Sequence, residues 1–357
     1  MNTKNPASTH RVEPSRAGRS ASLADVASLA GVSPGTVSRA LMRPAMISEA
    51  TRERVLAAAA RLGYVANGAA RALSMRRTMT VGAVVPRFGG SSFPTMIQAL
   101  ESALAAEGYI LLLAAPEHHH VDEASILRAL LERGVDAVAL LGSRHPPEVF
   151  GMLEAHRTPY VMMWSAPSQY GPSVGFDEAA AAALLIDHLG ALQHRHIGFI
   201  GGRTGDNERA LSRLQGLTQA IARRGLVLCE RALVETEYGF REGFEAMMEI
   251  LGRQTEATAV VCGNDYLAAG ALSALDHAGV AVPATLSVAS FNDNDFAPFL
   301  HPPLSTVRLP IREIGDRAAA YLLGCLQNDL TPPVQLLDVE LMVRCSTGPC
   351  PVQAGRP

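Results

Sequence analysis

Short polar side chains and one arginine lie close together near the start of the chain, at Ser33, Gly35, Thr36, Ser38 and Arg39. A guanidinium can pair bidentately with guanine or hold a phosphate, and short polar groups can reach base edges in a groove. The pattern therefore predicts a DNA-contacting surface. The alternative is an ordinary helical hairpin whose Ser/Thr face is solvated.

Residues 23–41 predict the two helices that would present these side chains, because apolar residues recur at helical spacing. Gly31 lies at the bend, where a positive φ is cheap only for glycine, and Ser33 can cap the second helix. The pattern is that of a helix-turn-helix, which places its second helix in the DNA major groove. Ser22 and Leu23, at the start of the first helix, complete the DNA contacts predicted here.

A third helix is predicted over residues 48–64, with Ser48 as its cap and Gly63 as its end. Its apolar stripe would close a small core with the first two helices, through Val55, Leu56, Ala59 and Leu62. Units of this size are small but viable. We therefore predict a DNA-binding domain over residues 22–66.

A short helical pattern with a basic end follows over residues 67–77. It is too short to be stable alone in water. It could fold when paired with a second copy on DNA, with Leu73 inserted as an apolar wedge into the minor groove and with Asn67 and Arg71 as further DNA contacts. The alternative is a plain linker with solvated charges.

Charge is divided unevenly along the 357 residues. The net charge is −3, yet residues 1–77 hold 12 Lys and Arg against 4 Asp and Glu, whereas the remainder holds 19 against 30. A basic front on an acidic body predicts a nucleic-acid partner for the front only. Residues 1–21 lack the apolar region of a signal peptide and are predicted to be a disordered basic arm. No stretch approaches the roughly 18 apolar residues of a membrane helix, so we expect a cytoplasmic protein without a membrane partner.

From Thr80 onward, short apolar runs alternate with helical stretches, which predicts parallel sheets covered by helices and a span long enough for two lobes. Open α/β sheets bind ligands at the carboxyl ends of their strands, so the cleft between the lobes is the expected site.

Other signals do not predict catalysis, a metal or a cofactor. The five cysteines lack C-x-x-C spacing, three adjacent histidines at 118–120 cannot all face one ion, and the glycines at 201–205 miss the dinucleotide-binding spacing. Lys4 is the only lysine, which excludes lysine catalysis in the body. We predict a DNA-binding regulator. The alternative is a sugar-binding or sugar-modifying protein with a nonfunctional N-terminal segment.

Motifs over about residues 22–347 resemble, in order and spacing, those of the lactose-repressor (LacI/GalR) family of bacterial transcription regulators, and the headpiece looks closest to the gluconate-repressor branch. The motifs include Leu23-Ala24-Asp25-Val26-Ala27, Thr36-Val37-Ser38-Arg39, Leu62-Gly63-Tyr64, Asn264-Asp265, Phe291-Asn292-Asp293 and Pro303-Leu304-Ser305-Thr306-Val307. The resemblance implies a homodimer on a near-palindromic operator, with paired hinge helices over 67–78. It also implies an effector-binding and dimerisation domain over 79–347, similar to a periplasmic sugar-binding protein, before a tail at 348–357. The tail has no leucine heptads, so we expect no tetramer.

The same resemblance implies where a small-molecule effector binds. Arg213 matches an arginine that holds ligand oxygens, Tyr238 matches a ring that stacks on a sugar, and Asn264 and Asn292 match ligand-contacting positions. Two further candidates are Phe93 and Trp164. Because Asn292 and Trp164 stand where relatives often carry acidic residues, we expect a sugar acid such as gluconate to be accepted without repulsion.

Overall fold

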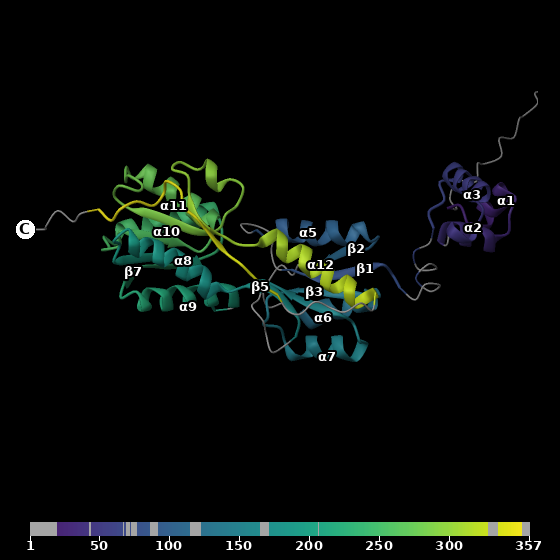
Figure 1. The fold of residues 1–357 in the computed structure, drawn as a ribbon, viewed down its shortest axis with the longest axis horizontal. Coiled ribbons are helices and arrows are strands. Elements are labelled where there is room, and N and C mark those ends of the chain that lie inside the picture. Colours follow the sequence, from purple (N-terminus) through teal and green to yellow (C-terminus); the bar gives the residue numbers. More distant parts are fainter. Residues whose placement is uncertain are drawn as a thin grey trace, which may run out of the picture. The chain divides into compact units, whose positions relative to one another are not determined.

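A computed structural model describes residues 20–42, 44–66, 68, 72, 77–85, 92–114, 123–164, 171–205, 207–327 and 335–351. The chain divides into two compact units, Met1–Thr78 and Met79–Pro357 (Figure 1).

The first unit contains a headpiece of three α-helices, α1 (Leu23–Ala30), α2 (Pro34–Met42) and α3 (Glu49–Leu62), with a short 3-10 turn η1 (Pro44–Met46) between the last two. Gly31 ends α1 with a φ of 64°, and Gly63 ends α3 with a φ of 59°, as their positions predicted. Small buried side chains form the core: Val26, Ala27, Ala30, Val37, Ala40, Val55, Ala58 and Ala59.

One prediction for α3 is wrong, and another holds only for the position of the residue. Leu56 and Leu62 were expected in the core but are 43% and 37% exposed. Leu56 lies about 100° around the helix from buried Val55, so the core-facing stripe passes beside it. Ser48 occupies the cap position, but its hydroxyl accepts no backbone N–H of the helix and donates instead to Thr51 Oγ1 at 2.9 Å.

The second unit contains two α/β lobes. In the first, termed the N lobe (residues 79–176 and 311–337), a six-stranded parallel sheet has the order β11-β5-β4-β3-β1-β2. Its strands are β1 (Thr80–Val84), β2 (Ile110–Ala114), β3 (Ala137–Leu141), β4 (Tyr160–Met163), β5 (Ser173–Phe176) and β11 (Gln335–Leu337). Helices α5 (Phe93–Ala106) and α12 (Ile311–Gln327) cover one face, and α6 (Glu123–Glu132) and α7 (Pro147–His156) cover the other (Figure 1).

The second lobe, termed the C lobe (residues 178–308 and 340–351), has a sheet of order β12-β10-β9-β8-β6-β7 in which only β12 is antiparallel. Its strands are β6 (His196–Gly202), β7 (Val227–Thr236), β8 (Ala259–Cys262), β9 (Ser287–Asn292), β10 (Ser305–Arg308) and β12 (Glu340–Met342). Its helices are α8 (Glu178–Ala191), α9 (Glu208–Arg223), α10 (Phe240–Gly252) and α11 (Asp265–His277), with a 3-10 turn η2 (Ala297–Phe299).

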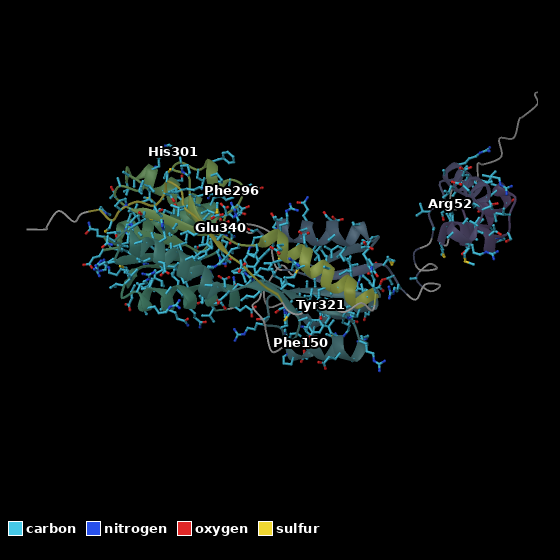
Figure 2. The ribbon with its side chains drawn as sticks, viewed as in Figure 1. Arg52, Phe150, Phe296, His301, Tyr321 and Glu340 are labelled. Atoms are coloured by element: carbon cyan, nitrogen blue, oxygen red, sulfur yellow. The ribbon has the colours of Figure 1, made fainter. Side chains whose placement is uncertain are left out.

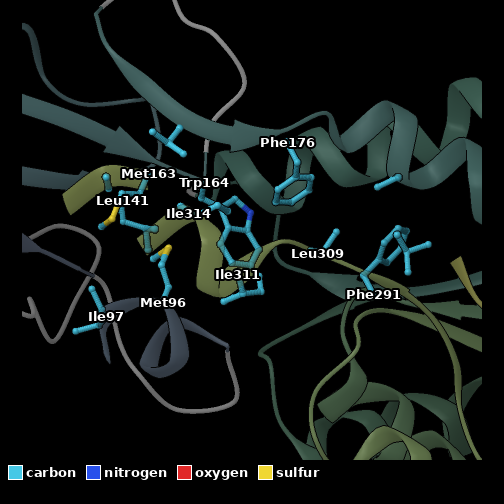
Figure 3. Close-up of a cluster of buried hydrophobic side chains, with 14 of the residues drawn as sticks. Met96, Ile97, Leu141, Met163, Trp164, Phe176, Phe291, Leu309, Ile311 and Ile314 are labelled. Carbon is cyan, nitrogen blue, oxygen red and sulfur yellow. The ribbon is translucent and has the colours of Figure 1, made fainter. Parts of the chain in front are cut away.

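Three short crossovers join the lobes, at residues 176–178, 308–311 and 337–340. The third enters the C lobe at Glu340 (Figure 2). A continuous apolar cluster passes beside these crossovers and includes Trp164 and Phe176 together with Phe291 and Leu309 (Figure 3). The two lobes therefore share buried surface at the place where the expected cleft lies.

Candidate DNA interface and effector cleft

Helix α2 carries the predicted DNA-contacting side chains on the side away from the headpiece core. Ser33, Gly35 and Arg39 are exposed, whereas Val37 and Ala40, on the opposite side, are buried. Thr36 and Ser38, the other two predicted contacts, are partly exposed. The helix can thus present hydroxyls and a guanidinium to a groove without disturbing its packing.

Local hydrogen bonds hold several of these groups in place. Ser33 Oγ accepts the backbone N–H of Thr36 at 3.1 Å, which caps α2, and Arg39 Nε donates to the Gly35 carbonyl at 3.2 Å. Ser22 caps α1 through a reciprocal pair of bonds with Asp25. Leu23 packs partly buried against the core. Asn67, Arg71 and Leu73 lie outside the described residues.

The candidate effector residues follow the carboxyl ends of strands, as open α/β sheets require. Trp164 follows β4, Tyr238 follows β7, Asn264 follows β8 and Asn292 ends β9. Phe93 begins α5, and Arg213 lies on α9.

Contacts bring three of these residues together. The rings of Phe93 and Trp164 meet edge to face, with centroids 5.3 Å apart. Trp164 Nε1 donates to Glu178 Oε1 at 3.3 Å, and Glu178 in turn accepts from Arg213. Glu178 thus links the N-lobe aromatic pair to the C-lobe arginine.

Arg213 is held by a buried ion pair. Its Nε and Nη2 each donate to a Glu178 carboxylate oxygen at 2.8 Å, its Nη1 donates to the Gly263 carbonyl, and its guanidinium lies 4.7 Å from the Phe291 ring centroid. Burial acts to lower the pKa of Arg213, but the Glu178 carboxylate outweighs it and raises that pKa. The arginine is therefore a fixed cation that is buried against Glu178.

Asn292 is buried with one polar atom unsatisfied. Its Nδ2 donates to Ser92 Oγ at 3.0 Å, whereas its Oδ1 has no hydrogen-bond partner among the described residues. Its φ of 112° is rarely adopted by a residue other than glycine. Strain and an unpartnered acceptor at one position are typical of a ligand site.

Tyr238 and Asn264 have structural contacts of their own. The Tyr238 ring lies against Gly202, where an added Cβ would come within 2.6 Å of it, and burial raises the pKa of the phenol. Asn264 Oδ1 accepts the N–H of Leu267 at 2.9 Å and so caps α11.

Sequence reasoning missed four polar residues of this region: Ser92, Glu178, Arg209 and Asp265. Glu178 bears on the expected charge of the ligand, because it places a carboxylate beside Trp164 where the sequence argument assumed none. In the sequence, Glu178 is marked only by its position directly after the helix cap Asp177. Carboxylates with a purely structural role are common at that position. Arg209 lies with its guanidinium 5.5 Å from the Phe93 ring centroid.

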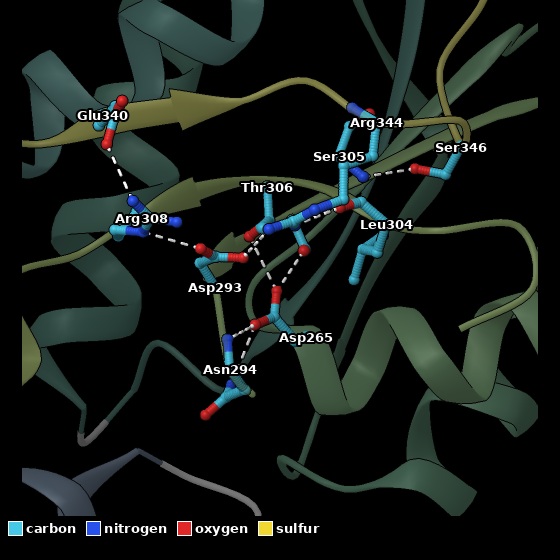
Figure 4. A network of polar contacts seen from close by, with 11 residues as sticks. Asp265, Asp293, Asn294, Leu304, Ser305, Thr306, Arg308, Glu340, Arg344 and Ser346 are labelled. Atoms are coloured by element: carbon cyan, nitrogen blue, oxygen red, sulfur yellow. Dashed lines mark hydrogen bonds and ion pairs between the residues drawn. The ribbon is translucent and has the colours of Figure 1, made fainter. Parts of the chain in front are cut away.

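Asp265 organises a network of polar contacts in the C lobe (Figure 4). Its buried carboxylate accepts from Ser290 Oγ, from Thr306 Oγ1 at 2.8 Å and from both the backbone and side-chain N–H of Asn294. Burial raises the pKa of Asp265 to about 6. Asn294 Oδ1 then accepts from N-lobe Ser92 at 2.9 Å, which joins the two lobes.

A helix-turn-helix headpiece followed by a two-lobed α/β domain with polar side chains at the carboxyl ends of its strands defines a DNA-binding regulator of transcription. Comparison with known families agrees with this class. Residues 22–67 match the model described as bacterial regulatory proteins, lacI family, and residues 186–347 match that of the periplasmic binding protein-like domain.

Individual relatives match three quarters of the chain or more. The HTH-type transcriptional repressor CytR of Escherichia coli (strain K12) is 34% identical over 335 residues, 93% of this chain and 97% of that protein. The transcription regulator GntR from Chromobacterium violaceum is 30% identical with a TM-score of 0.71, covering 75% of this chain and 99% of that one. The lac repressor dimer bound to operator and the anti-inducer ONPF is 26% identical with a TM-score of 0.81, covering 92% and 100%.

This chain therefore belongs to the lacI family of bacterial regulatory proteins. The predicted family and the predicted two-part architecture are both confirmed. Among the described residues, no helix has the length and apolar character needed to cross a membrane. That part of the chain also contains no group of three or more His, Cys, Asp or Glu that could hold a metal ion, and the histidines at 118–120 lie outside it.

Proposed function

We propose that this protein represses transcription by binding a near-palindromic operator as a homodimer, and that a small sugar or sugar acid in the interlobe cleft changes its operator affinity. The repressor relatives, and the solved lac repressor dimer on its operator, support the DNA-binding and dimeric parts. The proposed DNA contacts are those of α2 and the start of α1, with Asn67, Arg71 and Leu73 from the segment over 67–78.

The unpartnered Asn292 Oδ1 is the observation that carries the effector proposal. A buried acceptor left unsatisfied costs about 1–3 kcal/mol, and a ligand hydroxyl that donated to it would remove that cost. The neighbouring Phe93 and Trp164 rings suit the C–H side of a sugar, and Arg213 suits hydroxyl pairs or a carboxylate.

A sugar acid would add its negative charge to a site that already contains positively and negatively charged side chains. Arg209 and Arg213 are the nearby cations, and Glu178 and Glu208 are the nearby carboxylates. We therefore place gluconate first and its neutral analogue glucose second among the ligands to be tested.

Thermal unfolding of the full chain with D-gluconate and with D-glucose tests this proposal. A ligand at about 100 times its Kd adds about 2.7 kcal/mol of stability. Asn292→Asp should weaken gluconate binding about tenfold or more through like-charge repulsion and affect glucose less. Asp295→Asn, an exposed change in the same loop, is the matched control. No shift with either ligand would contradict the sugar or sugar-acid effector, and a gluconate shift unchanged in Asn292→Asp would remove Asn292 from the site.

A further inference from the structure

Each of the three crossovers enters or leaves the C lobe at a charged residue. The first reaches the C lobe at Glu178, the second leaves it from Arg308, and the third re-enters it at Glu340. Glu178 is paired with Arg213 of the cleft. The other two belong to a separate group of charges centred on Asp293 (Figure 4).

Asp293 holds two arginines through one buried carboxylate. Its Oδ2 accepts from Arg308 Nε at 2.8 Å and its Oδ1 accepts from Arg344 Nη2 at 2.7 Å, while its own side chain is only 6% exposed. Arg308 Nη1 also contacts Glu340 Oε2 at 3.1 Å. One carboxylate therefore fixes the second crossover directly and the third through Arg308.

The backbone ties this group of charges to the effector cleft. Asp293 directly follows Asn292, and their φ values of 56° and 112° are both in the region that side chains disfavour. Two adjacent strained residues cannot relax independently, because a change at one peptide alters the position of the next. Because the two residues share a peptide unit, the backbone conformation of Asn292 sets the position of the Asp293 carboxylate, which holds Arg308.

We propose that Asp293 is a positioning residue that couples the effector cleft to the second and third crossovers, so that a change at Asn292 alters the angle between the lobes. The functional role of this coupling rests on the proposed effector response. It can be measured without any ligand, because the contacts of Asp293 are present in the protein alone.

Hydrogen exchange of the ligand-free full chain compares Asp293→Asn with Asp295→Asn, a matched change two residues away at an exposed position. Loss of a charge-assisted bond should raise exchange about tenfold. We expect this increase on the N-lobe side of the second crossover, at the amides of Ile311 and Ile314, and along β12, with β8 unchanged. Faster exchange confined to the loop at 292–295, or spread equally through β8, would overturn the coupling.

Arg308→Gln is a second variant that keeps the test decisive if Asp293→Asn folds poorly, because Arg308 is 49% exposed. It removes the link from Asp293 to both crossovers and should give the same exchange pattern. If it leaves Ile311, Ile314 and β12 protected, the coupling does not exist. Failure to find a sugar ligand would contradict the proposed function alone, since neither exchange experiment contains one.

Discussion

Arg213 is both a proposed ligand contact and one member of a buried ion pair. The side chains of Arg213 and Glu178 are only 5% and 11% exposed. Each charge has lost most of its contact with water and is stabilised by the opposite charge instead. Removing one member of such a pair is costly, because the remaining charge stays buried. Effects of variants at Arg213 on ligand response must therefore be separated from effects on folding.

Arg213→Ala should lower the free energy of unfolding by about 3 kcal/mol, because it leaves the Glu178 carboxylate buried without its cation. Urea denaturation measures this loss. The double variant Arg213→Met with Glu178→Gln should recover most of it, since neither charge then remains. Both variants should lose the thermal shift given by an effector while operator affinity without effector stays as it was. A double variant as unstable as Arg213→Ala would show that the ion pair is not the source of the loss.

The sequence could name candidate residues one by one, but it could not show which residues the fold brings into contact. Phe93, Trp164 and Arg213 were named from the sequence, and they join one chain of contacts. Glu178 completes that chain but lies 14 and 35 residues from its two partners, at the start of a helix where carboxylates are common. Nothing in its local pattern separates it from an ordinary helix-capping carboxylate.

At the scale of elements, the start of α1 depends on a small reciprocal bond pattern. The Ser22 hydroxyl accepts the N–H of Asp25, and the Asp25 carboxylate accepts the N–H of Ser22 at 2.8 Å. This capping box satisfies backbone donors that a short helix would leave unpaired. It matters here because α1 supports α2 in the headpiece core.

Ser22→Ala should reduce the stability of the headpiece by about 1 kcal/mol, because the cap to the Asp25 amide is lost. Hydrogen exchange of the α1 amides measures the effect. Ser28→Ala, an exposed change within the same helix, is the control and should leave protection equal or slightly raised, since alanine favours helices. Equal protection in both variants would show that the cap does not stabilise α1.

Elements with strong periodicity were predicted, and elements that depend on distant pairing were not. The helical stretches expected from Thr80 onward are present, for example as α5, α8 and α9. The strands β11 and β12 escaped prediction because each is three residues long and lies at a sheet edge, where neighbours far away in sequence define it. Periodicity needs more turns or repeats than such strands provide.

At the scale of the whole molecule, charge separates the two units. The basic excess lies in residues 1–77, and the remainder of the chain is acidic. An acidic body is repelled by phosphates, so it orients the basic headpiece toward DNA and disfavours binding through other surfaces.

Operator affinity should fall steeply with salt, because binding releases the counterions of each phosphate that the protein neutralises. Each such phosphate contributes about −0.9 to the slope of log affinity against log salt concentration. Fluorescence anisotropy across salt, with DNA selected from a random pool by the unaltered protein, measures the slope. If Arg39 contacts a phosphate, Arg39→Ala reduces the slope by about 1, whereas Arg133→Ala, at an exposed position directly after α6, leaves it unchanged. A flat salt dependence would contradict the DNA-binding role of the headpiece.

The interleaved crossovers also fix an order of completion during synthesis on the ribosome. The headpiece has all three of its helices once residue 62 has emerged. The N-lobe sheet, in contrast, waits for β11 at residues 335–337, and the C-lobe sheet waits for β12 at residues 340–342. Because domains fold as units in the order in which they are made, a nascent chain carries a finished DNA-reading headpiece for most of its translation. Throughout that interval the headpiece exists without completed lobes, so the proposed control by a small molecule would begin only as the last strands are made.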